Sequence, residues 1–197
     1  MKLLAGRVGQ VINYQSLSND VGVDGMTIKA WLSILEASYV VFRLPPYFEN
    51  FGKRVIKTPK IYFTDTGLLC YLLGIERVEQ VGRDPLIGNL FKNLVILEAL
   101  KARYNRGLTP NLYFFRDSQG HEIDLLHKHG SELMGVAIKA ASTWNASFKH
   151  TLQYFDQHFT TLATRAIVYS GQALEFSDGI KALSYKNVQR LFVDADT

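Results

Sequence analysis

The stretch 111–139 constrains the fold more than any other part of this chain. Segments 112–116, 122–127 and 132–139 are rich in apolar residues and have the length of short β-strands. Because side chains of a strand alternate between its two faces, residues 122, 124 and 126 are expected to share one face, and so are residues 133, 135, 137 and 139. The intervening turns are short and rich in Asp, Ser, His and Gly, which favours hairpins. We therefore expect three consecutive strands joined by two hairpins.

Helical periods surround these strands. Apolar residues spaced by three and four predict a long helix over 86–104 and a shorter one over 147–159. An apolar run at 165–170 predicts a buried strand, and the tail 185–193 predicts a short closing helix. The order helix, three strands, helix, strand predicts a three-layer α/β core with a central mixed sheet.

The first part of the chain predicts a different architecture. Helices over 16–21 and 27–37 are joined by a tight turn, which is the pattern of a helix-turn-helix. Apolar strands at 39–44 and 55–65 follow, and the loop 45–54 between them is interpreted as the wing of a winged helix. This part is expected to contact another macromolecule.

A short connector helix is predicted after these strands, with Asp65 or Thr66 as its cap and Gly74 at its end. No Ser-, Gly- or Pro-rich linker follows it. We expect two domains, a winged helix-turn-helix with its connector over 1–74 and an α/β domain over 75–197.

The net charge of the chain does not decide which class of molecule it binds. The net charge of +4 and the pI of about 9.1 permit contact with DNA without requiring it. The residues expected to reach nucleic acid are Thr27, Lys29, Arg43, Lys53, Arg54 and Lys57. The alternative is a protein partner or self-association, because the second helix carries one Lys and also Glu36.

Other features narrow the class of protein. The single cysteine, Cys70, excludes an internal disulfide and lies in an apolar run, so it is interpreted as a small buried hydrophobe. The chain has no signal peptide and no apolar run of membrane length, and a cytoplasmic location is expected. It has no phosphate-binding loop, so ATP hydrolysis by this chain alone is not expected.

Three residues suggest a metal-dependent phosphodiesterase site. Asp124 in the middle strand and Glu98 on the long helix are candidate ligands for Mg²⁺, and Lys139 is a candidate for orienting the attacking water. Two positions before Lys139, where a second strand carboxylate would complete the site, stands Ala137. Two hypotheses follow: a working nuclease, or a nuclease-like scaffold kept for packing and interaction. Helical spacing also allows Glu98 a simple role, paired to a cation at the edge of its apolar stripe.

Five segments that cover nearly the whole chain are, in order, GRVGQVINYQSLSNDVGVDGMTIKAWLSILEASYVVFRLPPY, KRVIKTPKIYFTDTGLLCYLLG, GNLFKNLVILEAL, YFFRDSQGHEIDLL and IKAAST. In these segments the chain resembles the DUF4143 domain, the C-terminal region of a family of bacterial and archaeal AAA+-type ATPases. The resemblance implies a winged helix followed by a PD-(D/E)XK nuclease-like core, and an ATPase domain that normally precedes both. This chain would then be a fragment or a stand-alone remnant. It departs from the family at Ala137, where Glu is frequent, and at Lys92, where an acidic residue is frequent.

The resulting hypothesis is a binding or regulatory module with a degenerate nuclease site and no certain cofactor. The first alternative is an active Mg²⁺-dependent nuclease that uses Asp124, Glu98 and Lys139. The second is a domain that serves only for self-association.

Overall fold

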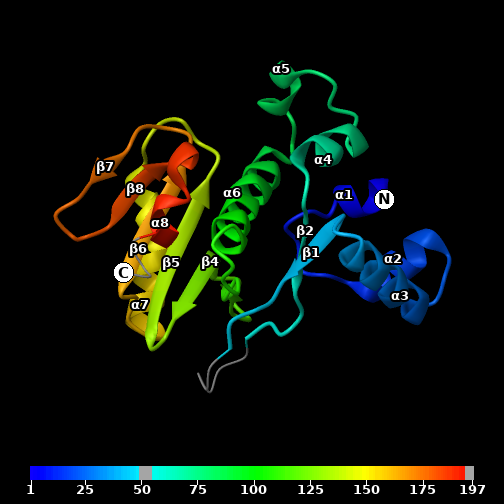
Figure 1. The fold of residues 1–197 in the computed structure, drawn as a ribbon, viewed down its shortest axis with the longest axis horizontal. Coiled ribbons are helices and arrows are strands. Elements are labelled where there is room, and N and C mark those ends of the chain that lie inside the picture. Colours follow the sequence, from blue (N-terminus) through cyan, green and yellow to red (C-terminus); the bar gives the residue numbers. More distant parts are fainter. Residues whose placement is uncertain (49–54, 194–197) are drawn as a thin grey trace. The chain divides into compact units, whose positions relative to one another are not determined.

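The computed structural model describes residues 1–48 and 55–193. Together these residues form eight α-helices, a two-stranded sheet and an open mixed sheet of six strands (Figure 1). Within the same residues no helix has the length and apolar character that a membrane crossing needs. The predicted mixture of helices with a central mixed sheet is confirmed.

The chain divides into two compact units. Unit 1 comprises 1–44 and 58–93, and unit 2 comprises 45–57 and 94–197. The division falls inside a helix at residue 93, whereas the sequence suggested a boundary after residue 74. The first half of this helix belongs to unit 1 because the side chain of Asn93 is hydrogen-bonded to the backbone of Phe63.

Unit 1 contains the helical pair that the sequence predicted. Its elements are α1 (Lys2–Ala5), α2 (Tyr14–Val21), α3 (Gly25–Ala37), β1 (Val41–Leu44), β2 (Lys60–Phe63), α4 (Thr66–Leu72), α5 (Val78–Val81) and the first half of α6 (Ile87–Tyr104). Both α2 and α3 begin two residues earlier than expected. Asn13 caps α2 by accepting the Ser16 N–H at 2.9 Å, and Asp24 caps α3 by accepting the Met26 N–H at 2.8 Å. Gly22 ends α2 with a φ of 76°, a conformation that glycine adopts without strain.

Strand β2 organises the centre of unit 1. It pairs antiparallel with β1, and all four of its residues are buried. The Asn93 side chain of α6 is fully buried, where it accepts the Phe63 N–H at 2.7 Å and donates to the Phe63 carbonyl at 3.0 Å. These two hydrogen bonds fasten the first half of α6 to β2. Two residues after the end of β2, Asp65 caps α4 as predicted, by accepting the Leu68 N–H at 2.6 Å.

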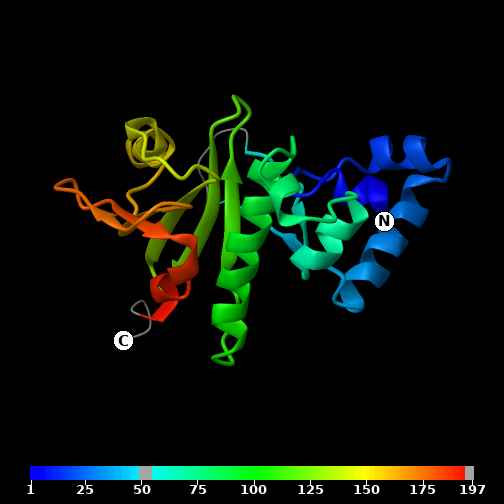
Figure 2. The same cartoon turned by 90° about the horizontal axis from the view of Figure 1, so that it is seen from above.

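Unit 2 is built on the six-stranded sheet. Its elements are the second half of α6, β3 (Leu112–Arg116), β4 (Glu122–His129), β5 (Glu132–Lys139), α7 (His150–His158), β6 (Thr164–Tyr169), β7 (Leu174–Glu175), β8 (Lys181–Ser184) and α8 (Arg190–Val193), with 3₁₀ turns at Ala146–Lys149 and Tyr185–Asn187. The strand order is β3-β4-β5-β6-β8-β7. Pairing is antiparallel from β3 to β5, parallel from β5 through β6 to β8, and antiparallel at β7. Helix α7 covers one face, and α8 and the second half of α6 cover the other (Figure 2). The last two strands were not predicted.

The loop interpreted as a wing does not stand free at its described ends. The Tyr47 N–H donates to the Phe114 carbonyl at 2.7 Å, and the Phe114 N–H donates to the Pro45 carbonyl at 3.0 Å. On the far side of the loop, the Ile56 N–H donates to the Arg116 carbonyl at 3.0 Å. Both ends therefore cover the open edge of β3, which satisfies backbone groups that an edge strand otherwise exposes.

Candidate functional site

Asp124 lies at an irregularity of strand β4. Between the pairs Tyr113–Leu126 and Phe115–Ile123, β4 contains one residue more than β3, which is the arrangement of a β-bulge. The extra residue reverses the alternation. Ile123 and Leu126 consequently both face the core under α7, and the expectation that residues 122, 124 and 126 share one face is wrong.

The Asp124 carboxylate is buried and bonded to backbone. Only 5% of the residue is exposed, and one carboxylate oxygen accepts the Ile138 N–H at 2.8 Å. The bulge thus directs this carboxylate at strand β5, beside the residue that precedes Lys139. A carboxylate in this position links β4 to β5, because it satisfies a buried backbone N–H of the neighbouring strand.

Strand β5 shows why the site lacks a second acid. Leu133 and Ala137 belong to the apolar cluster beneath α7, and Ala137 is completely buried. The predicted alternation of β5 is confirmed at these positions. Lys139 ends the strand, partly exposed and in register with Tyr169 of β6. The position that would complete the metal site is therefore occupied by a methyl group packed in the core.

Glu98 does not point into the core. Its carboxylate pairs with Lys101 one turn further along α6, at 2.9 Å, and its side chain is 42% exposed. This is the simple role that helical spacing allowed. Across residues 1–48 and 55–193, no three His, Cys, Asp or Glu side chains are placed to hold a metal ion.

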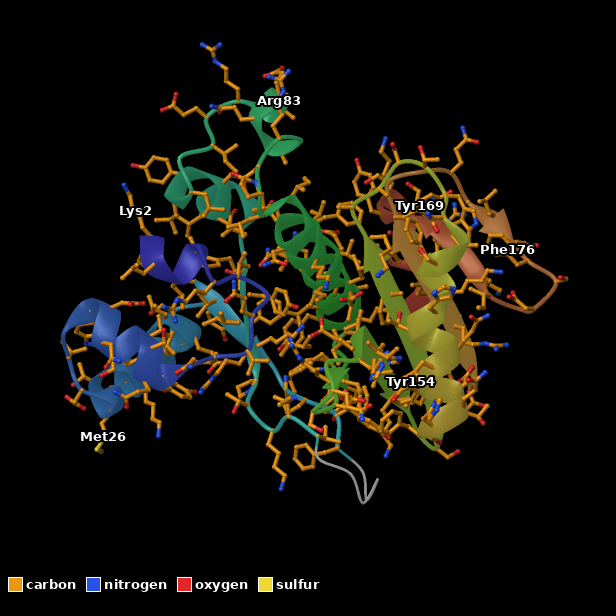
Figure 3. The ribbon with its side chains drawn as sticks, turned by 180° about the vertical axis from the view of Figure 1, so that it is seen from behind. Lys2, Met26, Arg83, Tyr154, Tyr169 and Phe176 are labelled. Atoms are coloured by element: carbon orange, nitrogen blue, oxygen red, sulfur yellow. The ribbon has the colours of Figure 1, made fainter. Side chains whose placement is uncertain are left out.

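A second cluster of polar groups lies at the turn between β3 and β4. Asp117 accepts the backbone N–H groups of Gln119 and His121, each at 2.9 Å, and its second oxygen lies 2.9 Å from the His121 ring. Burial opposes ionisation of Asp117, but these hydrogen bonds outweigh burial and lower its pKa. The His121 ring stacks on Tyr154 of α7 at 3.8 Å, and His158 stacks near Tyr154 at 4.2 Å; Tyr154 is visible in Figure 3. The Asp-Ser-Gln-Gly-His run was the only sequence signal for this cluster.

Three of the six residues expected to bind nucleic acid make contacts within unit 1. Arg43 makes a two-nitrogen ion pair with Glu36, with its Nε at 2.7 Å. The Thr27 hydroxyl donates to the Asp24 carboxylate at 2.6 Å, within the α3 cap. The Lys29 ammonium lies over the Tyr14 ring at 5.4 Å.

The remaining three basic candidates belong to the loop region. Lys57 is exposed, and Lys53 and Arg54 lie outside the described residues. The structure therefore does not gather these candidates into one basic surface within its described parts.

Helix α3 exposes apolar side chains on its outward face. Met26 is 80% exposed, Ile34 61% and Trp31 46%, and Figure 3 shows Met26 projecting away from the chain. Ile28 and Leu32 occupy the opposite, buried face. A helix that reads a DNA groove presents polar and cationic groups outward, so this face has the composition of a protein contact.

Two family comparisons cover most of the chain. Residues 1–79 match a family described as domain of unknown function DUF8612, and residues 87–188 match the domain of unknown function DUF4143. Among curated proteins, the uncharacterized protein Rv2008c of Mycobacterium tuberculosis is 37% identical over 171 residues, and so is the uncharacterized protein Mb2031c of Mycobacterium bovis. The match takes in 86% of this chain and 37% of each relative, so the chain spans a little over a third of the length of those proteins.

Proposed function

Since this chain belongs to the DUF4143 family, a family defined by a domain of unknown function, we propose from its geometry that it is a non-catalytic binding module. Unit 2 is its scaffold, and the outward face of α3 in unit 1 is its contact surface. The observation that carries the proposal is the exposure of Met26, Trp31 and Ile34 on that face.

The partner with the matching surface is a second copy of this chain. Between Met26 and Ile34 on the outward face stand the small exposed residues Ala30 and Ser33, and Ala37 follows. Small side chains thus lie between and beyond the large ones along one face. Two such helices packed across a two-fold axis place each large side chain over a small one.

The contact between two α3 helices is expected to be weak because its area is small. Helix α3 has 13 residues and is roughly 20 Å long, so a pair of these helices buries less area than a stable dimer needs. Association would therefore depend on concentration, and it would be strengthened inside a longer protein that holds several copies close together.

The family context of the module is part of the same proposal. We take α2, α3, β1 and β2 as a winged-helix variant and unit 2 as a nuclease-like core, carried in the family by AAA+-type ATPases. The greater length of the mycobacterial relatives supports a larger parent protein. The bulge at Asp124, with Lys139 ending the adjacent strand, supports a core descended from a metal-dependent nuclease.

Sedimentation velocity over a range of concentrations tests the contact surface. The wild type is expected to show a reversible monomer–dimer equilibrium. The double variant Met26→Glu/Ile34→Glu is expected to remain monomeric, because it places charges in the contact. Tyr71→Glu is the matched control, since Tyr71 is 75% exposed in unit 1 but lies on α4.

A parallel titration of labelled duplex DNA at two salt concentrations separates the two partner classes. We expect weak DNA affinity that the double variant leaves unchanged. A wild type that is monomeric at every concentration, or DNA affinity that falls steeply with salt, would refute the proposal.

The second candidate function is a Mg²⁺-dependent nuclease, favoured by the buried carboxylate of Asp124 beside the end of β5. Calorimetric titration of Mg²⁺ and Mn²⁺, with a plasmid-nicking assay alongside, tests it. Metal binding and nicking that both vanish in Asp124→Ala would establish the nuclease. We expect neither, because Glu98 is paired to Lys101 and Ala137 offers no ligand.

A further inference from the structure

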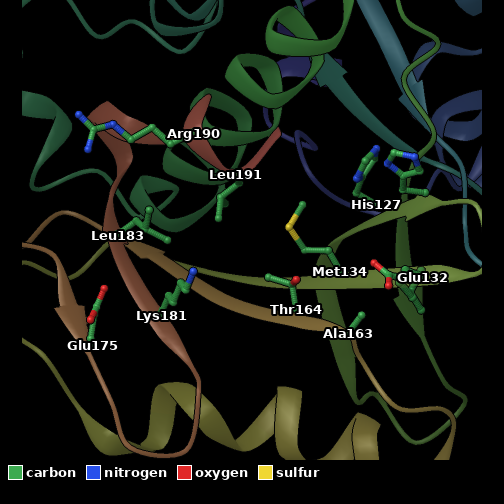
Figure 4. Close-up of a pocket in the computed structure, with 12 residues that line it drawn as sticks. His127, Glu132, Met134, Ala163, Thr164, Glu175, Lys181, Leu183, Arg190 and Leu191 are labelled. Carbon is green, nitrogen blue, oxygen red and sulfur yellow. The ribbon is translucent and has the colours of Figure 1, made fainter. Parts of the chain in front are cut away.

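Unit 2 contains a pocket that neither the proposed contact surface nor the Asp124 region uses. It lies on the face of the sheet opposite α7, under α8, where β5, β6 and β8 begin (Figure 4). Its volume is about 530 Å³, within the range of small-molecule sites. This size admits a ligand well beyond a single ion or water.

The lining of the pocket combines apolar side chains with polar ones, some of them charged. Met134, Leu183 and Leu191 provide the apolar surface. Lys181 and Arg190 lie at one end together with Glu175, which leaves that end with a net positive charge, and Glu132 lies at the other end, with Met134 between (Figure 4). An elongated ligand therefore meets a cationic end and an apolar middle.

The two cations are available to a ligand. Both Lys181 and Arg190 are exposed, and the ion pairs formed among the described residues include neither of them. Glu175 stands in register with Lys181 on the neighbouring strand β7, but the two do not form an ion pair within 4 Å. An anionic head group would find two donors that need no other contact to be broken.

The charge balance selects the class of anion. Lys181 and Arg190 are offset by Glu132 and Glu175, so the pocket as a whole is close to neutral when its histidines are uncharged. A polyphosphate would be repelled by the two carboxylates. A single negative charge on an apolar body matches both the cationic end and the apolar middle.

From this arrangement we propose that the pocket binds an amphipathic organic monoanion. Its head group contacts Lys181 and Arg190, and its hydrocarbon body lies against Met134, Leu183 and Leu191. The proposal is independent of the contact surface on α3, which belongs to unit 1.

The three methionines of the chain provide a direct test. With ¹³C-methyl methionine labelling, Met134 reports on the pocket, Met26 on the α3 face, and Met1 on the N-terminus. The probe is octanoate, and 1-octanol is the neutral control of the same chain length. Assignment follows from the conservative variant Met26→Leu.

We expect octanoate to shift the Met134 methyl signal saturably and to leave Met1 and Met26 in place. Octanol and the variant Lys181→Gln/Arg190→Gln should each weaken binding by about tenfold, the value of two exposed charge contacts. Glu132→Gln is the matched control and should bind at least as tightly as the wild type. Since all these substituted side chains are exposed, far-UV circular dichroism should report an unchanged fold.

Three results would overturn the proposal. The first is a Met134 signal that does not move at high octanoate. The second is full affinity in the double variant or for octanol, which would exclude recognition of the head group. The third is an equal, non-saturating shift of all three methionines, which would indicate surface partitioning alone.

Discussion

Substitution of Asp124 distinguishes a structural carboxylate from a metal ligand. The carboxylate is 5% exposed and accepts the Ile138 N–H at 2.8 Å. Asp124→Asn keeps an oxygen that can accept this hydrogen bond and has nearly the same volume. Asp124→Ala removes the acceptor and leaves a buried N–H without its partner. If the role is structural, the alanine variant should be much less stable than the asparagine variant.

The magnitude follows from the burial of the group. An unsatisfied buried donor costs about 1–3 kcal/mol, and loss of the carboxylate contacts adds to that. We expect Asp124→Ala to lower the free energy of unfolding by about 2–3 kcal/mol and Asp124→Asn by about 1 kcal/mol. For a domain of this size, about 4 °C per kcal/mol converts these values to Tm decreases of about 8–12 °C and about 4 °C.

Differential scanning calorimetry in EDTA, repeated with Mg²⁺, measures both effects. The wild-type Tm should not respond to Mg²⁺, because one oxygen of the carboxylate accepts the Ile138 N–H and no three His, Cys, Asp or Glu side chains of the described residues are placed to hold a metal ion. A ligand at a hundred times its Kd stabilises by about 2.7 kcal/mol, an effect that would be clearly visible. A Mg²⁺-dependent rise in the wild-type Tm that both variants lose would refute the structural reading of Asp124.

Three further substitutions test other parts of the structure. Asn93→Leu should destabilise unit 1 by about 3 kcal/mol in urea unfolding, because it leaves the buried Phe63 N–H and carbonyl without the Asn93 side chain; an unchanged midpoint would contradict that role. Asp117→Asn should lower the free energy of unfolding by about 1–2 kcal/mol at pH 7. Because the pKa of Asp117 is lowered in the folded state, the ionised carboxylate stabilises the fold above its unfolded pKa of about 4 and loses this stabilising effect as the pH falls through the folded pKa. The difference in stability between the variant and the wild type should therefore shrink below about pH 4. Gly135→Ala should cost about 1–3 kcal/mol in the same assay, because its Cβ would lie 2.5 Å from a methyl group of buried Leu162; wild-type stability would show that this side chain moves aside freely.

Much of the secondary structure could be predicted from short-range sequence patterns. The hairpin strands β3, β4 and β5 and the helices α3, α6 and α7 follow from side-chain periods that each segment contains within itself. The alternation of β5 correctly placed Leu133 and Ala137 on one face. Helix starts were displaced by two residues, since Asn13 and Asp24 were better caps than the residues nearer the apolar stripe.

The candidate site was harder to read because its geometry depends on partners far away in sequence. A single extra residue in β4 has no signature in the alternation, yet it reverses the faces around Asp124. The bond from Asp124 to Ile138 spans 14 positions, and the pocket at Lys181 and Arg190 needs five strands and a helix to form its walls. The short strands β7 and β8 carry too few residues to show a period, and β8 takes its place only by pairing with β6.

By itself, the sequence determined the types of most elements, the mixed α/β class, the resemblance to the DUF4143 family and the absence of an acid at Ala137, because each of these is written in residue identity or in short-range periodicity. Tertiary structure alone decided that Glu98 pairs with Lys101, that the ends of the loop 45–57 cover β3, and that α3 exposes an apolar face. The physical reason is that burial and hydrogen bonding are properties of the surroundings of a residue, and those surroundings are assembled from distant parts of the chain.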